Sequence, residues 1–305
     1  MSKAQVCVIY NPAAGKGRGG ERLEKLRRAL GEHGVFRPTS EPGQGGELAL
    51  WAARDGFATV AAAGGDGTVH EVASGVLRAG RPEVTLAVIP VGSANDYAHS
   101  LGLDAGWWRQ ADPGIGVRRV DVGRARSGDR VRYFINGLGL GFNGAVTLQS
   151  RRIKRLQGLA LYGLALFRAL WSHYDQPLMT VTLDGQARTV PTLALSLAIG
   201  RREGNFTVAP DARLDDGLFD YIHAGPLPRR ALLAFLPGMV TGRLHIDHPA
   251  IWTGHCRQAR AHSEKPLIVH IDGEFFCLPE EDIRDIDVEL LPGALRVIGR
   301  METPS

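Results

Sequence analysis

The sequence predicts two domains, an N-terminal α/β domain and a C-terminal domain rich in antiparallel β-strands. In the first third of the 305 residues, apolar strand-like runs alternate with helix-like segments, which is typical of a mostly parallel sheet covered on both faces. From about Arg118 onward strands dominate, and several alternate apolar and polar residues, as strands of an antiparallel sheet with one solvated face do. We place the boundary so that the domains are 1–121 and 122–293, and the last strand, within 294–305, can pair with either.

The helices and strands follow from periodicity and from stop signals. Leu23, Leu26 and Leu30 recur at helical spacing, and Gly34 is a natural helix end. In the first domain we expect strands at 6–10, 59–63 and 84–89, and helices at 21–34, 47–53 and 69–79. In the second we expect strands at 120–125, 131–135, 179–183, 189–199, 218–222 and 267–271, with a last strand at 294–299.

The composition narrows the function classes. The net charge of +4 is too small to indicate a nucleic-acid partner, although a local cluster of cations would suit an anionic membrane surface. Cys7, Cys256 and Cys277 are widely spaced, which indicates a reducing compartment and no structural zinc. No apolar run approaches the ~20 residues of a membrane-spanning helix. We therefore expect a cytoplasmic protein, and the sequence leaves the oligomeric state open, a homodimer included.

Two glycine-rich turns follow neighbouring strands of the first domain. They are Gly64-Gly65-Asp66-Gly67-Thr68 and Gly92-Ser93-Ala94-Asn95-Asp96. Successive glycines let the backbone approach a phosphate closely, and helix N-termini favour anions. We expect Thr68 to cap the following helix, and Asp66 to meet a metal ion or to orient a water molecule. The pair of turns predicts a site for nucleotide phosphates and a divalent metal.

An earlier glycine-rich segment allows a second interpretation. Gly15, Gly17 and Gly20 satisfy the G-x-G-x-x-G pattern of dinucleotide sites, and Glu41 lies at a suitable distance for a ribose. However, Asn11-Pro12-Ala13-Ala14 separates the strand from the glycines, whereas a dinucleotide turn follows its strand tightly. We favour a basic loop in which Asn11 and Lys16 reach phosphate oxygens.

Six blocks of residues, in order along the chain, resemble the signature of the bacterial diacylglycerol-kinase-like lipid kinases, a family related to sphingosine and ceramide kinases. The blocks are Asn11 to Gly15, Gly64 to Thr68, Gly92 to Asp96, Phe134-Ile135-Asn136, Pro210 to Gly217 and Asp272-Gly273-Glu274. The resemblance covers almost the whole chain. It implies an N-terminal domain like those of NAD kinases and phosphofructokinases, with ATP in a cleft between the two domains.

The same resemblance implies roles for individual residues. ATP would be bound by Asn11, Lys16, Thr39, Gly64, Gly65, Asp66, Gly67, Thr68, Ser93 and Asn95. Glu274 would be the general base, and Asp66 and Asp96 would be further catalytic carboxylates. A structural Mg²⁺ would be held by Asp216 and by the backbone carbonyls of Arg213 and Leu218, where Ca²⁺ could substitute.

The residues themselves also favour a catalytic role for Glu274. Asp272-Gly273 lies between two apolar strands and is a hairpin signal, as is Asp184-Gly185. Gln186 follows the turn at Asp184-Gly185, which indicates a purely structural role for that turn. The carboxylate of Glu274, flanked by Ile271 and Phe275, follows the turn at Asp272-Gly273. A carboxylate in apolar surroundings would have a raised pKa, which suits removal of a proton from an alcohol. A plain turn is the alternative.

The acceptor is less well defined. In the segment 198–206 Ile199 replaces the family's usual Asn, and Asn205-Phe206 interrupts a run of glycines. A diacylglycerol-like lipid is the default acceptor, with phosphatidylglycerol, a sphingoid base or ceramide, and a polyprenol left open. Two other functions remain as alternatives: a soluble-metabolite kinase of the NAD kinase type, and a non-catalytic nucleotide-binding regulator.

A lipid acceptor requires contact with a membrane. Arg151, Arg152, Lys154 and Arg155 immediately precede an apolar segment, 156–171, that is rich in Leu, Ala and aromatic residues. Cations beside a short apolar helix suit the inner face of a membrane with anionic headgroups. A core helix with a solvated basic start is the alternative interpretation, and Arg229-Arg230 before residues 231–236 is a weaker second candidate.

Overall fold

The computed structural model describes residues 5–15, 18–109, 112–153, 158–172, 174–234 and 248–301. The chain divides into two compact units, Met1–Val122 together with Pro292–Ser305, and Gly123–Leu291. Two long strands, β5 (Ile115–Ser127) and β18 (Asp285–Arg300), contribute residues to both units.

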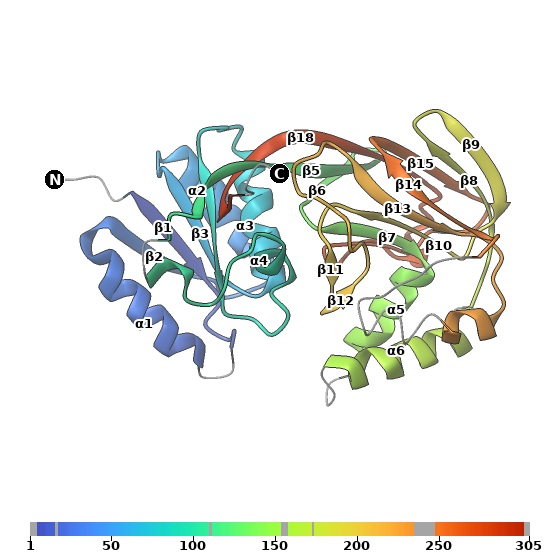
Figure 1. The fold of residues 1–305 in the computed structure, drawn as a ribbon, viewed down its shortest axis with the longest axis horizontal. Coiled ribbons are helices and arrows are strands. Elements are labelled where there is room, and N and C mark those ends of the chain that lie inside the picture. The colour runs from blue at the N-terminus through green and yellow to red at the C-terminus, as the bar shows by residue number, and fades with distance from the viewer. Residues whose placement is uncertain are drawn as a thin grey trace. The chain divides into compact units, whose positions relative to one another are not determined.

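The first unit contains a parallel sheet with the strand order β2-β1-β3-β4-β18 (Figure 1). Its strands besides β18 are β1 (Val6–Tyr10), β2 (Gly34–Pro38), β3 (Thr59–Gly64) and β4 (Thr85–Pro90). Its helices are α1 (Arg18–Leu30), α2 (Gln44–Arg54), α3 (Asp66–Arg78) and α4 (Asp96–Ser100), with 3₁₀ turns at Gly31–His33 and Trp107–Arg109. The prediction of an α/β domain is confirmed.

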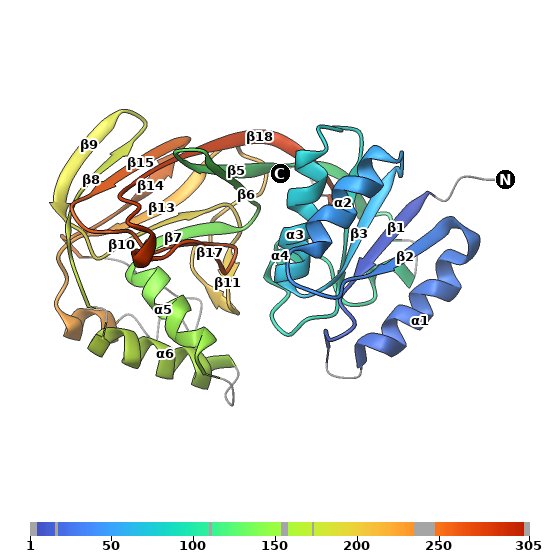
Figure 2. The ribbon, with the colours of Figure 1, turned by 180° about the vertical axis from the view of Figure 1, so that it is seen from behind.

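Helices cover both faces of this sheet because its strands bury side chains on both sides. Val8, Ala61 and Ala87 are aligned across β1, β3 and β4 and pack with Leu26 of α1. Cys7 and Val60 are aligned in the alternate row, on the face that α2 and α3 cover (Figure 2). Such strands read as continuous apolar runs, as the sequence of this domain does.

Helices α2 and α3 approach each other closely. A Cβ atom added at Gly75 of α3 would lie 2.2 Å from the backbone oxygen of Gly46 in α2. The Glu71 carboxylate of α3 accepts hydrogen bonds from the backbone N–H groups of Gly43 and Gly45, at 2.8 and 2.9 Å. It thereby satisfies donors at the start of α2 that have no partner within the helix.

The second unit contains two antiparallel sheets. One has the strand order β14-β13-β10-β7-β16-β17. The other contains β18, β15, β8 and β9, with β5 paired to β18 and β6 paired to β5. Phe134 of β6 stacks on Phe219 of β13 with ring centroids 5.7 Å apart, which joins the two sheets. The strands are β6 (Arg130–Phe134), β7 (Gly137–Gly141), β8 (Leu178–Leu183), β9 (Gln186–Pro191), β10 (Ala194–Ala198), β11 (Arg202–Glu203), β12 (Phe206–Thr207), β13 (Phe219–Ala224), β14 (Ile251–Cys256), β15 (Gln258–Ser263), β16 (Val269–Ile271) and β17 (Glu274–Cys277), with a 3₁₀ turn at Pro279–Glu281. The predicted β-rich domain is confirmed.

Two helices of this unit, α5 (Phe142–Arg151) and α6 (Gly158–Ser172), lie against one sheet face. Ala169 and Leu170 of α6 pack with Phe142 of α5, while Phe167 and Trp171 point outward with 62% and 80% of their surface exposed. One face of the apolar segment is therefore core and another is solvated. None of the described helices is both long and apolar enough to cross a membrane.

Several elements differ from the sequence prediction. Strands β2, β7, β14 and β15 were not expected, and the single strand predicted for 189–199 is broken at Thr192-Leu193. Strand β7 has the sequence Gly-Leu-Gly-Leu-Gly, and glycine disfavours strands. It forms because β10 and β16 pair with it on both sides, which is a non-local effect.

A histidine is buried in the second unit, and none of the described residues gives it an acidic partner. His223 of β13 is fully buried, and its Nε2 lies 3.0 Å from the Thr192 hydroxyl. Burial, with a smaller contribution from the positive charge of Arg188, lowers the pKa of His223 to about 4. The imidazole is therefore neutral in the folded protein at ordinary pH.

We predict that Gly75→Ala destabilises the protein by roughly 2 kcal/mol, because the new methyl group would overlap the α2 backbone. The matched control is Gly163→Ala in α6, where a Cβ would meet nothing within 4 Å. There alanine should stabilise by about 0.5–1 kcal/mol through its better helix propensity. Thermal unfolding of both variants measures this, and equal shifts of the two would contradict the packing.

We predict a pH-dependent loss of stability that originates at His223. Its folded-state pKa lies below the unfolded value of 6.5, so the unfolded chain binds the proton first as the pH falls. Stability should decline between pH 6.5 and about 4, by at most about 3 kcal/mol, and be unaffected by this group at higher pH. Urea unfolding of His223→Gln should show a flatter profile over this range, while the exposed His33→Gln should follow the wild type.

Candidate active site

The carboxyl ends of the parallel strands gather the residues that the sequence indicated for nucleotide binding. Thr39 follows β2, and its N–H donates to the Tyr10 carbonyl at the end of β1 (2.9 Å). Asn11 follows β1, and its N–H donates to Ala63 of β3 (3.2 Å). The strand order reverses between β1 and β3, and ligands of open α/β sheets bind at such a point.

The two glycine turns are in direct backbone contact. The Gly64 carbonyl accepts hydrogen bonds from the N–H groups of Val91 and Gly92, at 3.0 and 3.2 Å. A Cβ atom at Gly92 would lie 2.4 Å from the Cα of Gly65. Glycine is required here by the close approach of two main chains, and the turns form one continuous backbone surface.

The first glycine-rich loop meets the same surface. Gly15 has a φ of +78°, and a Cβ there would lie 2.8 Å from the Val91 carbonyl oxygen. The Asn11 side chain accepts a hydrogen bond from the N–H of Ala13 (2.9 Å) and so shapes the turn that precedes Gly15. Lys16, the predicted cation of this loop, lies outside the described residues.

Asp66 belongs to the first glycine turn and is the first residue of α3. Its carboxylate accepts a hydrogen bond from the N–H of Tyr97 in α4 (3.2 Å). Burial raises the pKa of Asp66, and hydrogen bonds from backbone N–H groups, that of Tyr97 first, oppose this effect. Asp96, the first residue of α4, is buried. Two carboxylates thus lie at this edge of the sheet.

The remaining predicted residues of the second turn have distinct environments. Asn95 adopts a left-handed conformation with a φ of +54°, and its side chain donates to the Gly92 carbonyl (2.9 Å). Ser93 is exposed, with its hydroxyl available to a ligand.

The predicted capping role of Thr68 is wrong. Helix α3 begins at Asp66 and its N-cap is Gly65, so Gly67 and Thr68 are in the first turn of the helix. The Thr68 side chain instead packs against Gly64, where a Cβ would lie 2.4 Å from its hydroxyl oxygen. The N-cap Gly65 has no side chain that could accept hydrogen bonds from the first turn of α3, and helix N-termini attract anions.

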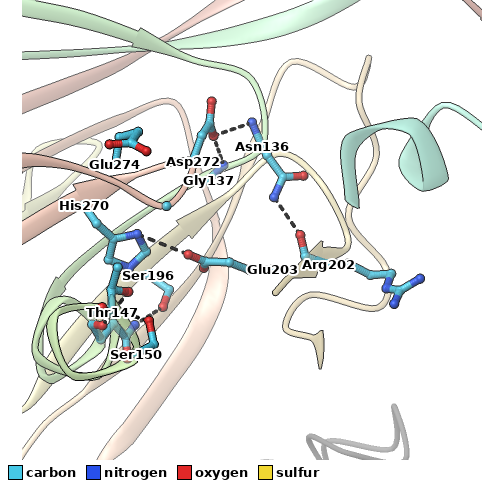
Figure 3. Close-up of polar contacts among 12 residues, drawn as sticks. Asn136, Gly137, Thr147, Ser150, Ser196, Arg202, Glu203, His270, Asp272 and Glu274 are labelled. Carbon is cyan, nitrogen blue, oxygen red and sulfur yellow. Dashed lines mark hydrogen bonds and ion pairs between the residues drawn. The ribbon is translucent and has the colours of Figure 1, made fainter. Parts of the chain in front are cut away.

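The predicted hairpin at Asp272-Gly273 is present in the second unit. Both residues have positive φ, +49° and +80°, and they connect β16 to β17. The Asp272 carboxylate accepts hydrogen bonds from the N–H groups of Ile135, Asn136 and Gly137, each at 2.9 Å. Figure 3 shows the bonds from Asn136 and Gly137. Asp184 in the matching turn likewise accepts from backbone N–H groups, those of Arg257 and Gln258. Asp272 therefore fixes the position of the turn that carries Glu274.

The apolar surroundings expected for Glu274 are wrong. Its side chain is 46% exposed, and Nη2 of Arg151 lies 2.7 Å from its Oε1. The Arg151 guanidinium also donates to the Gly273 carbonyl (2.7 Å) and lies 5.1 Å from the centre of the Phe275 ring. Arg151 belongs to the basic segment for which the sequence suggests a membrane surface. In the structure its guanidinium group contacts the Glu274 carboxylate instead. Arg151 and Glu274 are more than 100 residues apart in the sequence, so no local sequence pattern could predict this pair.

The loop proposed for the metal is rich in carboxylates. The Asp216 carboxylate is exposed and accepts a hydrogen bond from the Leu218 N–H (3.0 Å). Burial, and to a smaller degree the charges of Asp216 and Asp211, raise the pKa of Asp220, and the charge of His255 opposes them. Among the described residues, no group of three or more His, Cys, Asp or Glu side chains forms a metal site. The predicted site would use one carboxylate and two backbone carbonyls, so it does not require three such side chains. Its ligands would all be oxygen atoms, which suit a hard cation such as Mg²⁺ or Ca²⁺.

A further polar cluster beside the hairpin was not predicted. His270 of β16 is 1% exposed, and its Nδ1 lies 3.1 Å from Oε1 of Glu203 in β11 (Figure 3). Asn136 donates to the Arg202 carbonyl (2.6 Å) and so attaches β11 to the segment that Asp272 holds. The sequence indicated this cluster only indirectly: Glu203 lies in the segment 198–206, which departs from the family pattern.

Comparison with known proteins gives two matching families and several full-length relatives. Residues 5–125 match the diacylglycerol kinase catalytic domain, and residues 137–299 match the YegS C-terminal NAD kinase beta sandwich-like domain. A probable YegS-like lipid kinase of Pseudomonas aeruginosa (strain PAO1) is 30% identical over 319 residues, covering 97% of this chain and 95% of that protein. A diacylglycerol kinase of Bacillus subtilis (strain 168) is 30% identical and covers 88% and 89%.

The fold is shared with solved structures. A crystal structure of a putative diacylglycerol kinase from Bacillus anthracis str. Sterne superposes with a TM-score of 0.74 at 22% identity, covering 98% of each chain. The family matches extend over both units, and the relatives span nearly the whole chain. The chain therefore belongs to the diacylglycerol-kinase-like lipid kinase family.

Proposed function

We propose that this protein is an ATP-dependent lipid kinase that phosphorylates a hydroxyl group of a diacylglycerol-like lipid. The observation that carries the proposal is the backbone contact between the turns at Gly65 and Gly92. It creates a surface of N–H groups at a helix N-terminus, where phosphates bind, in a chain of the lipid kinase family.

The first unit supplies the nucleotide site. Phosphate oxygens would accept hydrogen bonds from the N–H groups of the turn at 64–68, and from Ser93, Asn95 and Asn11. Lys16 would add a positive charge. The close packing of Gly15 and Gly92 excludes side chains from this surface, so phosphates can approach the main chain. The donors are fixed before the reaction, which makes them effective for charge that develops in the transition state.

The proposed metal is Mg²⁺, with Ca²⁺ as a substitute. Asp216 and the backbone carbonyls of Arg213 and Leu218 would hold a structural ion, and Asp66 and Asp96 would face the ion that accompanies ATP. When bound, such ions neutralise negative charge on the phosphates and on the carboxylate-rich loop.

Glu274 is the proposed general base. One oxygen of its carboxylate is held by Arg151, and the other would accept the proton of the lipid hydroxyl. The hydroxyl oxygen then forms a bond to the γ-phosphorus as the bond from that phosphorus to the β,γ-bridging oxygen breaks and ADP leaves. The three hydrogen bonds to Asp272 limit movement of the turn and keep the base in place.

We expect Glu274→Gln to lower the rate of phosphoryl transfer by about 10²–10⁴-fold, because glutamine cannot accept the proton. The measurement is transfer of labelled γ-phosphate from ATP into a mixed bacterial lipid extract. The identity of a lipid that only the wild type labels would name the acceptor.

The control for this experiment is ATP binding, which Glu274→Gln should retain. Labelled lipid at equal rates in both proteins would contradict the role of Glu274. Bound ATP without any labelled lipid would instead favour a soluble-metabolite kinase or a nucleotide-binding regulator.

We further propose that the protein contacts the inner face of the membrane through α6. Phe167 and Trp171 lie one helical turn apart and are exposed, and Leu233 of the segment that packs beside α6 is 50% exposed. Arg168, Arg229 and Arg230 are exposed in the same two segments. Exposed aromatic residues with neighbouring cations favour an anionic bilayer surface.

We predict that Trp171→Ser weakens binding to phosphatidylglycerol-containing vesicles by roughly tenfold, since a buried aromatic side chain contributes about 1.5–3 kcal/mol. Trp51→Ser on α2, where the side chain is also exposed, is the control and should bind as the wild type does. Co-sedimentation with anionic and with neutral vesicles measures the effect. Equal binding of the two variants would exclude α6 as the contact.

A further inference from the structure

Strand β17, which begins with the proposed base Glu274, lies at the edge of its sheet. It pairs with β16 on one side, and none of the described strands pairs with its other edge. The ladder with β16 is also irregular, because Phe276 is an extra residue between two aligned pairs and forms a bulge. Edges and bulges leave backbone groups without a partner in the ladder. Carbonyl groups of β17 therefore need hydrogen-bond donors from elsewhere.

Arginine side chains of β6 supply these donors. Nη1 of Arg132 donates to the Phe275 carbonyl (2.8 Å), and Nη1 of Arg130 donates to the Phe276 carbonyl (2.5 Å). Strand β6 belongs to the other sheet of this unit and pairs with β5 alone among the described strands, so it is an edge as well. Side chains thus join the edges of the two sheets at this place.

The sequence of β6 explains why both arginines reach β17. Arg130, Arg132 and Phe134 alternate along the strand and so lie on one face of it. Phe134 stacks on Phe219 of β13, which shows that this face meets the other sheet. Arg132 is aligned with Ala125 of β5, and Ala125 is fully buried. The two cations therefore point inward, toward the edge that lacks a partner strand.

The two arginines hold different ends of β17. Arg130 is half-buried and forms two hydrogen bonds with the carboxylate of Glu281, at 2.9 and 2.8 Å, in the turn that follows the strand. Arg132 is exposed and contacts β17 at the residue directly after Glu274. Arg130 thus anchors the far end of the strand, whereas Arg132 acts at the end that carries the proposed base.

Side chains from other elements bind the backbone on both sides of Glu274. Before it, Asp272 binds backbone N–H groups at residues 135–137, and Arg151 of α5 donates to the Gly273 carbonyl (2.7 Å). After it, Arg132 holds the Phe275 carbonyl. Segments with few contacts open locally even when the rest of a protein stays folded. Loss of Arg132 would therefore give the proposed base more freedom of movement.

We infer that Arg132 is a positioning residue for Glu274, because it takes the place of a neighbouring strand at the carbonyl next to the base. The inference rests on the proposed lipid kinase function, in which Glu274 accepts the proton of the acceptor hydroxyl. A general base must lie within hydrogen-bond reach of that proton. A displacement of about 1 Å can cost about 10²-fold in rate. Arg132 should therefore affect the transfer step, and ATP binding should not depend on it.

The test measures kcat, the KM for ATP and the thermal unfolding midpoint of Arg132→Ala, with labelled ATP and a saturating bacterial lipid extract in mixed micelles. We expect kcat to fall by about tenfold, as for an interaction that matters only in the transition state. The KM for ATP and the unfolding midpoint should stay close to the wild type, since Arg132 is exposed. Arg132→Lys should restore most of kcat, because an ammonium group can donate to the same carbonyl.

A second arm removes the base. In the Glu274→Gln protein there is no base to position, so adding Arg132→Ala should lower the remaining rate by less than about twofold. A contact that only stabilises the fold would lower the rate by the same factor in both backgrounds.

The matched control is Arg126→Ala. Arg126 of β5 is exposed and is aligned with Val131, which alternates with Arg132 along β6. Its side chain therefore lies on the opposite face, away from β17. This variant should keep the kcat of the wild type.

Each outcome decides the inference. An unchanged kcat in Arg132→Ala, or a loss that persists in the Glu274→Gln background, overturns it and leaves the lipid kinase proposal standing. A loss of kcat with a lowered unfolding midpoint that Arg132→Lys does not restore also overturns it, because Arg132 would then act on stability. Labelling of no lipid by the wild type overturns the proposed function, and the inference with it.

Discussion

The second unit depends on one carboxylate, that of Asp272, and the three backbone N–H groups it binds. Hydrogen bonds to a charged acceptor are stronger than those between neutral groups. Here they join the tip of the β16–β17 hairpin to the corner between β6 and β7. Asn136 at that corner holds the Arg202 carbonyl, which sets the place of Glu203. The proposed base and the polar cluster are thus positioned from a common point.

The first unit reaches its geometry by a different physical route. Its site depends on the absence of side chains, because Gly15, Gly64 and Gly92 each lie where a Cβ would collide with the neighbouring segment. Because side chains are excluded at these glycines, a ligand that approaches the turns would meet main-chain atoms rather than charged side chains. Asp66 of the first turn adds a buried carboxylate, whose pKa is raised by burial, while hydrogen bonds from backbone N–H groups oppose this effect. The arrangement suits a polyanionic ligand accompanied by a cation.

The sequence predicted features that depend on neighbouring residues, and it did not predict contacts between residues that are far apart in the chain. Apolar runs and glycines in the sequence predicted the parallel strands β1, β3 and β4, both hairpin turns and the gathering of the first three motifs, but not the parallel strand β2. The sequence predicted that this helix, α3, begins at residue 69, because Thr68 is a favourable N-cap residue. In the structure Gly65 is the N-cap and α3 begins three residues earlier, at Asp66. Strand β7 and the Arg151–Glu274 pair could not be predicted, since each requires partners far away in the sequence.

The local and the distant determinants lie in different parts of the molecule. The turns proposed to bind phosphates are short motifs in which the close packing of two main chains requires glycine. The polar contacts of Glu203 with His270 and of Asn143 with Ser196 are made by β11, β16, α5 and β10, outside those turns. Glu203 lies in the segment that departs from the family pattern, and the structure brings it to the buried His270 of β16.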